Sequence, residues 1–223
     1  MRVDRCFGFI DLSGFTSFTE RHGDERTVLV LAELRTMLRE AAARRGVRVV
    51  KWLGDGAMLS STMVDAVVAL VVEIDEKLGQ RLPSLPLRAG MASGPVIMFE
   101  GDDYIGRAVN VAARLCDQAR PHELLATTEV AAERPAWVGA QPATAVSVRG
   151  LATEVATRCL FLRDAGDDAV TDPVCGLTIA RAHTVRDEGG RRFCSAACAD
   201  AWLDRRPARP GDFGPVLPFQ PTA

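Results

Sequence analysis

The stretch Cys6-Phe7-Gly8-Phe9-Ile10-Asp11-Leu12-Ser13-Gly14 joins a short apolar run to an abrupt polar end. The apolar part, residues 6–10, predicts a buried β-strand. The small and polar residues that follow it predict a turn at the end of this strand. Residues 15–22 can then begin a helix, so the chain is predicted to open with a strand, a tight turn and a helix.

The next segments alternate between strand and helix patterns. Apolar residues at helical spacing across residues 25–45 predict a helix that ends at Gly46. Asp55-Gly56 separates two apolar runs, which predicts a β-hairpin. Further patterns predict strands at residues 47–53, 57–60, 87–92, 96–99, 124–127, 146–148 and 156–162, and helices at residues 64–78 and 106–118. Helices mixed with antiparallel strands in this order predict an α+β sandwich.

The chain has 223 residues, with 27 lysines and arginines against 29 aspartates and glutamates, and a formal net charge of −2. This balance gives no electrostatic footprint for nucleic acid or an anionic membrane. The most apolar run, residues 66–72, is far shorter than the roughly 20 residues that span a bilayer. Residues 1–5 lead into no apolar signal-peptide core. We therefore expect a soluble, cytoplasmic protein without nucleic-acid or membrane partners.

The composition changes after Arg163. Residues 1–163 carry the patterned strands and helices, and residues 164–171 are acidic, as expected of a linker. Residues 172–207 form a cysteine-bearing unit, and residues 208–223 form a tail rich in proline and glycine. We therefore predict one large domain, a linker, a small module and a tail.

Six cysteines do not make a disulfide scaffold in a chain of this length. Three of them lie apart in apolar surroundings and are predicted to pack in the core. These are Cys6, Cys116 and Cys159. Cys175, Cys194 and Cys198 instead crowd into the last fifth of the chain. In a reducing compartment, this clustering predicts a metal site before a disulfide.

Asp11 and Asp55 each stand at the end of a predicted strand. If the two strands are neighbours, both carboxylates can converge at one edge of the sheet. Paired carboxylates suit hard divalent cations such as Mg²⁺. Taken singly, Asp11 is also explained as a helix cap and Asp55 as a turn residue.

The turn Leu12-Ser13-Gly14-Phe15-Thr16 leads from the first strand into a helix. Its backbone N–H groups, aided by the helix dipole, can cradle a phosphate. The sequence contains neither a Walker A loop nor a G-x-G-x-x-G motif, so the P-loop and dinucleotide-binding classes lack support. It also lacks the G-x-S-x-G nucleophile elbow of the hydrolases.

The helix predicted at residues 106–118 carries a second polar group. Asn110 and Arg114 are four residues apart, so they share one helix face. An amide suits a sugar oxygen, and a guanidinium suits a phosphate. A solvated polar helix face is the plainer explanation of this pair. Apolar residues surround the pair, and this weakens that explanation.

Three blocks of the sequence together resemble the class III nucleotidyl cyclases: residues 9–16, residues 51–56 and residues 103–114. Their order and separation also fit, and the resemblance covers roughly residues 5–163. It implies the ferredoxin-like cyclase sandwich, an α+β fold with a mostly antiparallel sheet and helices packed on it. It also implies a homodimer with shared active sites, because this family forms its site between two catalytic domains.

The resemblance implies a role for each matching position. Asp11 and Asp55, with Leu12 beside them, would hold two Mg²⁺ or Mn²⁺ ions. Lys51 and Asp103 would bind the adenine edge, although the neighbouring Asp102 leaves a one-residue ambiguity. The remaining positions would bind the rest of the nucleotide: Asn110 the ribose, Arg114 the α-phosphate, Arg149 the terminal phosphates, and Gly14, Phe15 and Thr16 further parts of the substrate.

The implied activity is that of an adenylate cyclase, which converts ATP to 3′,5′-cyclic AMP and pyrophosphate. Lysine has only donors and a carboxylate only acceptors, so Lys51 and Asp103 complement the N1 acceptor and N6 donor of adenine. Guanine presents the reverse pattern at these atoms. Two alternatives stay open: a guanylate cyclase, and a non-catalytic nucleotide-binding regulator that retains the fold as a dimerisation and sensing scaffold.

The segments Asp172-Pro173-Val174-Cys175-Gly176 and Phe193-Cys194-Ser195-Ala196-Ala197-Cys198 resemble a YHS-type metal-binding domain. Cys194 and Cys198 are four residues apart, so both thiolates can face one ion from a helical turn, with Cys175 joining from another turn. Thiolate ligands favour Zn²⁺ or Cu⁺. His183 is the candidate fourth ligand. A structural role and a sensory role for this metal are both open.

Overall fold

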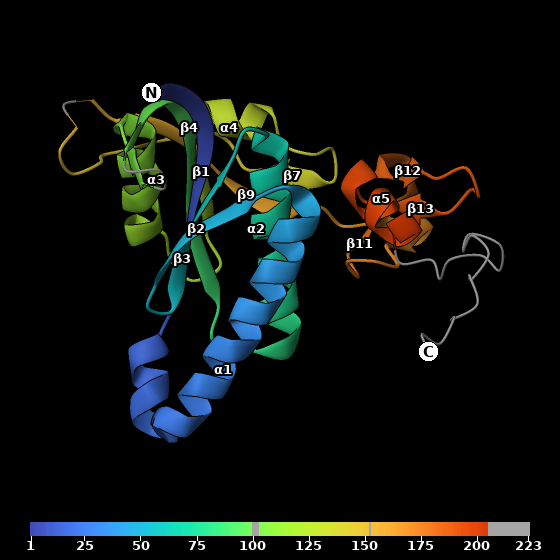
Figure 1. The fold of residues 1–223 in the computed structure, drawn as a ribbon, viewed down its shortest axis with the longest axis horizontal. Helices are drawn as coiled ribbons and strands as arrows, with labels where there is room; N and C mark the ends of the chain where they lie inside the picture. Colours follow the sequence, from blue (N-terminus) through green and yellow to red (C-terminus); the bar gives the residue numbers. More distant parts are fainter. Residues whose placement is uncertain (100–102, 152, 205–223) are drawn as a thin grey trace, which may run out of the picture.

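The computed structural model describes residues 1–99, 103–151 and 153–204 (Figure 1). Its larger, N-terminal part runs from a first strand through helices on both sides of a sheet to a last long strand. The elements of this part are β1 (Arg2–Leu12), α1 (Phe15–Arg45), β2 (Arg48–Leu53), β3 (Gly56–Ser61), α2 (Val64–Arg81), β4 (Leu87–Phe99), β5 (Asp103–Ile105), α3 (Arg107–Gln118), β6 (Leu124–Thr127), α4 (Thr128–Ala132), β7 (Val138–Ala140), β8 (Thr144–Val146) and β9 (Val155–Leu162).

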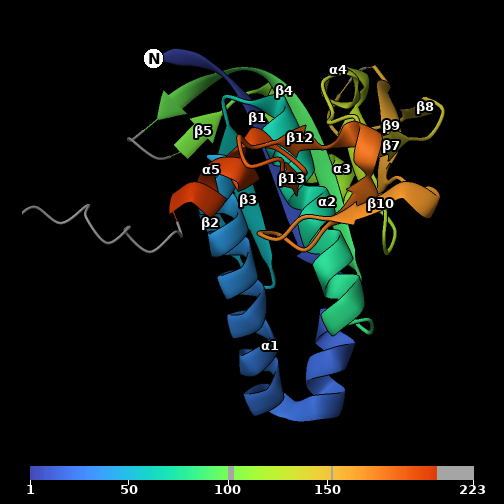
Figure 2. The same cartoon turned by 90° about the vertical axis from the view of Figure 1, so that its right-hand side faces the viewer.

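The strands of this part form one sheet in the order β2-β3-β1-β4-β6-β9-β7, with β5 added to β4 and β8 added to β9. Among the described residues, every pair of neighbouring strands in this sheet is antiparallel except β4 with β6. Helices α1 and α2 lie on one face of the sheet and α3 on the other, as Figures 1 and 2 show. The predicted α+β class, with a mostly antiparallel sheet and packed helices, is therefore confirmed.

Strand β1 lies inside the sheet and contributes to the cores on both of its faces. Cys6, Ile10 and Leu12 are buried in the core that includes α1 and α2. Phe7 is buried in the second core, with residues of α3. Side chains alternate along a strand, so Asp11 lies on the same face of the sheet as Phe7.

Helix α3 packs against β4 with no side chain between the two backbones at one point. A Cβ added at Gly90 of β4 would lie 2.2 Å from the carbonyl oxygen of Ala112 and from the backbone nitrogen of Cys116. Any larger residue at position 90 would push α3 away from the sheet. This close approach fixes the helix that carries Asn110 and Arg114.

The helices predicted at residues 15–22 and 25–45 are two arms of α1. Gly23 between them has φ 78° and ψ 168°, which is not helical. A residue with a side chain rarely adopts this backbone conformation, so glycine permits the sharp bend that Figure 2 shows. The shorter arm begins at the predicted phosphate turn.

Several strand boundaries differ from the prediction, and the short strands β5 and β7 have no counterpart in it. The strands expected at residues 87–92 and 96–99 are one continuous strand, β4. The strand expected at residues 146–148 is β8, which ends at Val146. The predicted β2–β3 hairpin is present, but its two-residue turn is Gly54-Asp55, one position earlier than expected. Gly54 supplies the positive φ of 67° that this tight turn requires.

The residues after β9 form a smaller part, with the two-stranded pairs β10–β11 and β12–β13. Its elements are η1 (Gly166–Asp168), β10 (Ala169–Thr171), β11 (Thr178–Ala180), η2 (Arg181–His183), β12 (Val185–Arg186), β13 (Arg192–Phe193) and α5 (Ala196–Asp204). Buried Leu177, Ile179 and Phe193 belong to the same core as Leu38 of α1 and Val68 of α2. The smaller part therefore packs on the larger one through a shared apolar core.

The predicted boundaries at residues 163, 171 and 207 remain a prediction, and the predicted tail at residues 208–223 lies outside the described residues. Across the described ranges, no helix combines the length and the apolarity that crossing a membrane requires.

Asp75 of α2 gives the fold a testable pH dependence. Its burial raises the pKa of Asp75 to about 6, although His122, with Nδ1 3.6 Å from Asp75 Oδ1, opposes the rise. A folded-state pKa above the ordinary 3.8 means that the contribution of Asp75 to stability falls as the pH rises from about 4 to about 6. Asp75→Asn should therefore stabilise the chain at pH 7 by about 1–2 kcal/mol, less than the full value of the shift because solvent screens part of it.

Urea unfolding at pH 7 and at pH 4.5 measures this effect. The gain should be largest at pH 7 and should shrink at pH 4.5, where Asp75 is protonated in the folded chain. The exposed Asp24 provides the control variant Asp24→Asn, which should change stability little at either pH. An equal gain for Asp75→Asn at both pH values would contradict the interpretation.

Candidate active site

Asp11 lies near the end of β1, on the face of the sheet that α3 covers. The register of β1 and β4 puts Arg88 directly opposite Asp11. The Nε of Arg88 donates a hydrogen bond of 2.9 Å to Oδ2 of Asp11. Both side chains are partly exposed, at 25% for Asp11 and 30% for Arg88. The carboxylate is thus held by a cation from the neighbouring strand while part of it stays accessible.

Asp55 lies in the turn between β2 and β3, and it lines the same cavity as Asp11. Burial and the nearby charge of Asp11 raise the pKa of Asp55, against hydrogen bonds from the backbone of Asp55 and Leu12. The turn also fits closely against β1, since a Cβ at Gly56 would lie 2.4 Å from the carbonyl oxygen of Ile10 and 3.2 Å from Oδ1 of Asp11. The two carboxylates therefore converge, as adjacent strands should bring them together.

Asp11 and Asp55 line a cavity of about 450 Å³ together with the turn at the start of α1. Leu12, Gly14, Phe15 and Thr16, all candidate residues from the sequence, line this cavity as well. Gly14, the N-cap of α1, has φ 80°, and no side chain caps this helix end. The first backbone N–H groups of α1 are therefore free of a capping side chain, as a phosphate-binding turn requires.

Arg88 also lines this cavity and is not among the residues predicted from the sequence. An arginine between Leu87 and Ala89 in a predicted strand was the available signal. Its partner depends on the pairing of β1 with β4, whose facing residues are 77 positions apart in the chain. A strand pattern alone does not supply that register.

Lys51 and Asp103 form a second polar group. Nζ of Lys51 lies 2.8 Å from Oδ1 of Asp103, and the same oxygen accepts a hydrogen bond from the backbone of Tyr104. The hydrogen bond from Lys51 is the main cause that lowers the pKa of Asp103. The two side chains are 44% and 49% exposed. Asp102, the alternative to Asp103, lies outside the described residues.

Asn110 and Arg114 lie on exposed positions of α3, one turn apart. Nη1 of Arg114 pairs with Oδ2 of Asp117 at 3.1 Å, and its side chain is 50% exposed. Arg149 is exposed in the segment between β8 and β9. Of the described residues that line the Asp11 cavity, none is Lys51, Asp103, Asn110, Arg114 or Arg149. A single chain therefore presents the predicted site in separate parts.

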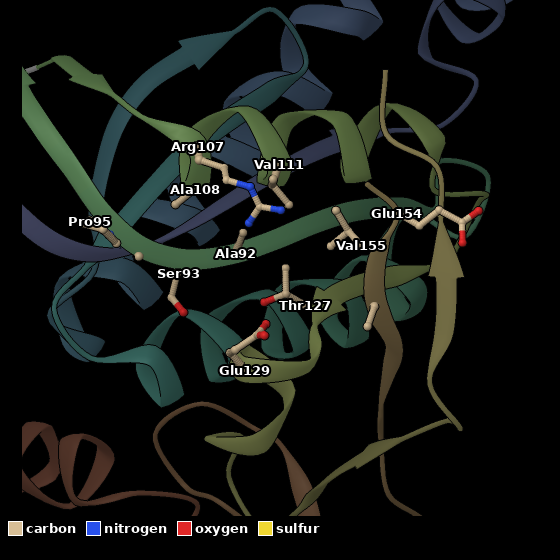
Figure 3. Close-up of a pocket in the computed structure, with 12 residues that line it drawn as sticks. Ala92, Ser93, Pro95, Arg107, Ala108, Val111, Thr127, Glu129, Glu154 and Val155 are labelled. Carbon is tan, nitrogen blue, oxygen red and sulfur yellow. The ribbon is translucent and has the colours of Figure 1, made fainter. Parts of the chain in front are cut away.

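A second cavity of about 450 Å³ lies beside α3 (Figure 3). Its polar side chains include Ser93, Arg107, Thr127 and Glu129. None of its described lining residues belongs to the set predicted from the sequence.

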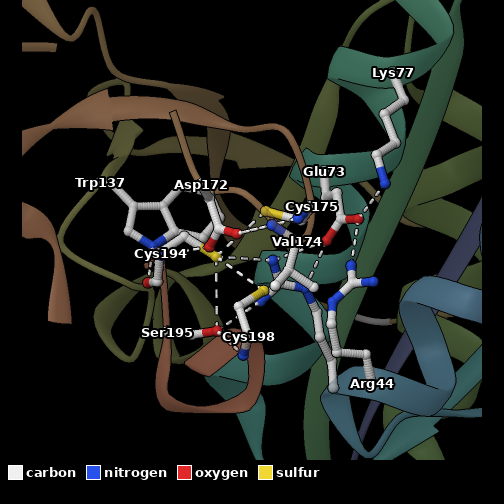
Figure 4. Close-up of polar contacts among 11 residues, drawn as sticks. Arg44, Glu73, Lys77, Trp137, Asp172, Val174, Cys175, Cys194, Ser195 and Cys198 are labelled. Atoms are coloured by element: carbon white, nitrogen blue, oxygen red, sulfur yellow. Dashed lines mark hydrogen bonds and ion pairs between the residues drawn. The ribbon is translucent and has the colours of Figure 1, made fainter. Parts of the chain in front are cut away.

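The three clustered cysteines meet in the smaller part of the structure (Figure 4). Sγ of Cys194 lies 3.6 Å from Sγ of Cys175 and 3.6 Å from Sγ of Cys198. Asp172 joins them, and the four candidate ligand atoms lie within 4.8 Å of one another, all in buried residues. A tetrahedral Zn²⁺ with Zn–S bonds near 2.3 Å separates its sulfur ligands by about 3.8 Å, so the cysteine spacing fits such an ion.

His183 does not belong to this cluster, contrary to the expected ligand set. It ends η2, between β11 and β12, whereas the cysteines come from the turn after β10, the end of β13 and helix α5. Asp172, from the first of the two YHS-like segments, is the additional group. Its Oδ1 accepts hydrogen bonds from the backbone of Val174 and Cys175, and its Oδ2 accepts one from Cys194.

The surroundings of Cys194 favour a thiolate. Hydrogen bonds from Cys175 and Cys198 lower the pKa of Cys194, and the charge and hydrogen bond of Arg45 lower it further. Nη2 of Arg45 lies 3.3 Å from Sγ of Cys194. Of the scattered cysteines, Cys6 and Cys116 are buried as predicted, and Cys159 is partly buried.

Comparison with known proteins identifies relatives of the larger part. Residues 4–157 match the family described as the adenylate and guanylate cyclase catalytic domain. An uncharacterized protein of Mycobacterium tuberculosis is 35% identical over 130 residues, which are 58% of this chain and 34% of that protein. An adenylate cyclase of Streptomyces coelicolor is 32% identical over 133 residues, which are 59% of this chain and 35% of that protein. The chain thus spans about a third of the length of these relatives.

The fold is also similar to solved structures. The adenylyl cyclase CyaB from P. aeruginosa superposes with a TM-score of 0.62 at 21% sequence identity, over 74% of this chain and 96% of that chain. At this identity the similarity concerns the fold. It agrees with the α+β class, in which helices pack on a mostly antiparallel sheet.

Proposed function

This chain belongs to the adenylate and guanylate cyclase catalytic domain family, and from that membership we propose that it converts ATP to 3′,5′-cyclic AMP and pyrophosphate. The observation that carries the proposal is the meeting of Asp11 and Asp55 in one cavity with the turn at the start of α1. Two carboxylates beside a phosphate-binding turn suit a triphosphate and its divalent cations.

In the proposed reaction, the ribose 3′-hydroxyl loses its proton to solvent, its oxygen bonds to the α-phosphorus, and the bond from the α-phosphorus to the leaving pyrophosphate breaks. The residues that would hold Mg²⁺ or Mn²⁺ are Asp11, Asp55 and the backbone of Leu12. When bound, such cations lower the pKa of the hydroxyl and neutralise charge on the leaving group. The donor set fits, because carboxylate and carbonyl oxygens are the ligands that these hard cations prefer.

The remaining residues would position the nucleotide. Asn110 would orient the ribose, and Arg114 would place positive charge beside the α-phosphate, where negative charge increases during the reaction. Gly14, Phe15 and Thr16 would bind the phosphates through the backbone of the first turn of α1. Arg149 would contact the terminal phosphates. Fixing the conformer is the main requirement of an intramolecular attack.

We further propose a homodimer with two shared sites. Lys51, Asp103 and Arg114 are about half exposed and do not line the cavity that contains Asp11. A nucleotide held by the phosphate turn of one subunit would need these groups from the other subunit. A two-fold axis would then produce two equivalent sites, each built from both chains.

A direct assay tests the proposed activity. The purified chain is incubated with ATP or GTP in the presence of Mg²⁺ or Mn²⁺, and the cyclic products are separated and quantified. We expect cyclic AMP as the main product. Mainly cyclic GMP would support a guanylate cyclase instead, and a folded chain that binds nucleotide without forming either product would support a non-catalytic regulator.

The Lys51–Asp103 pair predicts a specificity switch. Guanine offers an N1–H donor and an O6 acceptor, so the double variant Lys51→Glu/Asp103→Ser would complement guanine and would place a carboxylate against the N1 acceptor of adenine. Each group left unpaired in a closed site costs about 1–3 kcal/mol, so the ratio of kcat/KM for ATP over GTP should fall about a hundredfold. The ratio is measured in one preparation, which cancels any loss of folded enzyme. An unchanged ratio would contradict the assignment of these two residues.

We also propose that Cys175, Cys194 and Cys198, in a YHS-like module, bind a metal ion, Zn²⁺ or Cu⁺. The buried sulfur atoms at tetrahedral spacing support this proposal. The carboxylate oxygens of Asp172 already accept three backbone hydrogen bonds, which suits a residue that holds the two ligand loops together. Metal analysis of the purified chain, and of a variant with all three cysteines replaced by serine, tests the site.

A further inference from the structure

Arg45 is a buried arginine that the proposed cyclase chemistry does not use. It is the last residue of α1, and its side chain is 2% exposed. Its Nε donates a 2.8 Å hydrogen bond to Oε2 of Glu73 in α2. Its other nitrogens reach the smaller part of the chain, with Nη2 3.3 Å from Sγ of Cys194 and Nη1 3.4 Å from Oγ of Ser195. Burying a guanidinium costs free energy unless its N–H groups are paired, so the contacts of Arg45 with the smaller part require an explanation.

Glu73 is bonded to more cations than its single charge can neutralise. The single carboxylate of Glu73 accepts bonds from Arg44, Arg45 and Lys77, whose side chains are 7%, 2% and 23% exposed. Three cations on one carboxylate leave two positive charges in a largely buried place (Figure 4). Of these three cations, Arg45 also contacts a cysteine sulfur, so the larger part presents positive charge to Cys194. A cluster of metal-bound thiolates carries the negative charge that would offset it.

The larger part also holds the backbone of Cys194. Nε1 of the buried Trp137, which precedes β7, donates a 3.0 Å hydrogen bond to the carbonyl oxygen of Cys194. Cys194 is thus fixed at its sulfur by Arg45 and at its carbonyl by Trp137. Both anchors come from outside the segment of residues 172–204 that supplies the cysteines.

We propose that Arg45 is a positioning residue of the cysteine metal centre, so that metal binding at the cysteines stabilises the cyclase fold itself. This inference rests on the proposed metal site. It makes the smaller part an integral component of the catalytic structure rather than a tethered neighbour. It also connects the metal centre to β2 and the proposed active site, because Lys51 and Asp55 follow Arg45 within ten residues.

The test uses the full chain, stripped of metal and titrated with Co²⁺ and with Zn²⁺. The thiolate-to-cobalt charge-transfer absorption reports binding at the cysteines, and the thermal midpoint followed by circular dichroism reports the whole fold. In the unchanged chain, Zn²⁺ should raise the midpoint by about 5 °C or more. Arg45→Gln should weaken Co²⁺ binding about tenfold to a hundredfold, as loss of a group that orients metal ligands does. Arg45→Lys should restore part of this affinity.

Arg44→Gln is the matched control, because the hydrogen bond of Arg44 goes to Glu73 and not to a cysteine. Arg44→Gln should change Co²⁺ affinity by less than about threefold. It should lose stability for the same reason as Arg45→Gln, because both changes remove a hydrogen bond to Glu73. Equal Co²⁺ affinity for Arg45→Gln and the unchanged chain would overturn the inference. It would also be overturned if Zn²⁺ raised the thermal midpoint of Arg45→Gln by as much as that of the unchanged chain. If the unchanged chain itself binds neither ion, the proposed Zn²⁺ site fails together with the inference. All titrations are made well below the lowest midpoint, so that a less stable variant is still folded.

Discussion

Replacing Asp55 by Asn should reduce the rate of cyclic AMP formation by about a hundredfold to a thousandfold, the range for loss of a charged group that stabilises a transition state. Asn keeps the size of the side chain but loses the charge that would hold a divalent cation. The same change should leave the fold intact. Burial and Asp11 raise the pKa of Asp55, which means that its ionised form is disfavoured where it lies. Removing that charge should therefore keep or raise the thermal midpoint.

Initial rates with ATP and the thermal midpoint are measured on the same preparation. Asp4→Asn, at an exposed position of the same strand as Asp11, provides the control and should change neither quantity. A folded Asp55→Asn chain with an undiminished rate would rule out the proposed role of the carboxylate. A large loss of rate with a large loss of stability would mean that Asp55 acts mainly in the fold.

The sequence indicated that Asp11 and Asp55 converge only on the condition that their two strands are neighbours. A strand followed by a small-residue turn locates Asp11, and a hairpin signal locates Asp55. The remaining step, that the two strands are neighbours, is met by the pairing of β1 with β3. The position of the turn was one residue off, since Gly54 rather than Gly56 adopts the positive φ. A glycine on each side of Asp55 makes the two possibilities hard to separate from sequence.

Pro95 explains why β4 was predicted as two strands. Gly94-Pro95 is a pattern that interrupts strands, because proline has no N–H for the ladder. In the described sheet, β4 pairs with β6 through residues 89–91 and with β5 through residues 97–99. Pro95 falls between these two segments and pairs only with β1 there, opposite Asp4. The strand continues through the proline because the neighbouring strand changes at that point.

One reason explains why the sequence pattern did not assign roles to Arg45, Arg88 and Asp172. Each acts through a partner that is distant in the chain: Cys194 for Arg45, Asp11 for Arg88, and the backbone of Cys194 for Asp172. The sequence shows which residue types are present, but such pairs exist only after the sheet and the smaller part have packed. His183 shows the converse, since a metal-binding residue type close in sequence was placed elsewhere by the fold.

Mixing two inactive subunits should restore activity if the sites are shared. Asp11→Asn removes a group from the phosphate-turn half of the site, and Arg114→Ala removes one from the α3 half, so each variant alone should retain less than about 1% of the rate. A mixed dimer has one site with both defects and one site with neither. Equal mixing makes half of the dimers mixed, so about a quarter of the normal rate should return.

The variants are mixed under conditions that allow subunit exchange, and the rate is compared with the sum of the separate rates. A mixture of Asp11→Asn with Asp55→Asn is the matched control, because both changes lie in the same half and every site would remain defective. This control should show no gain. No gain in the first mixture either, with dimers of both kinds present by mass, would mean that each site is built within one chain. Arg114 would then have to reach the Asp11 cavity of its own subunit, although it does not line that cavity in the structure.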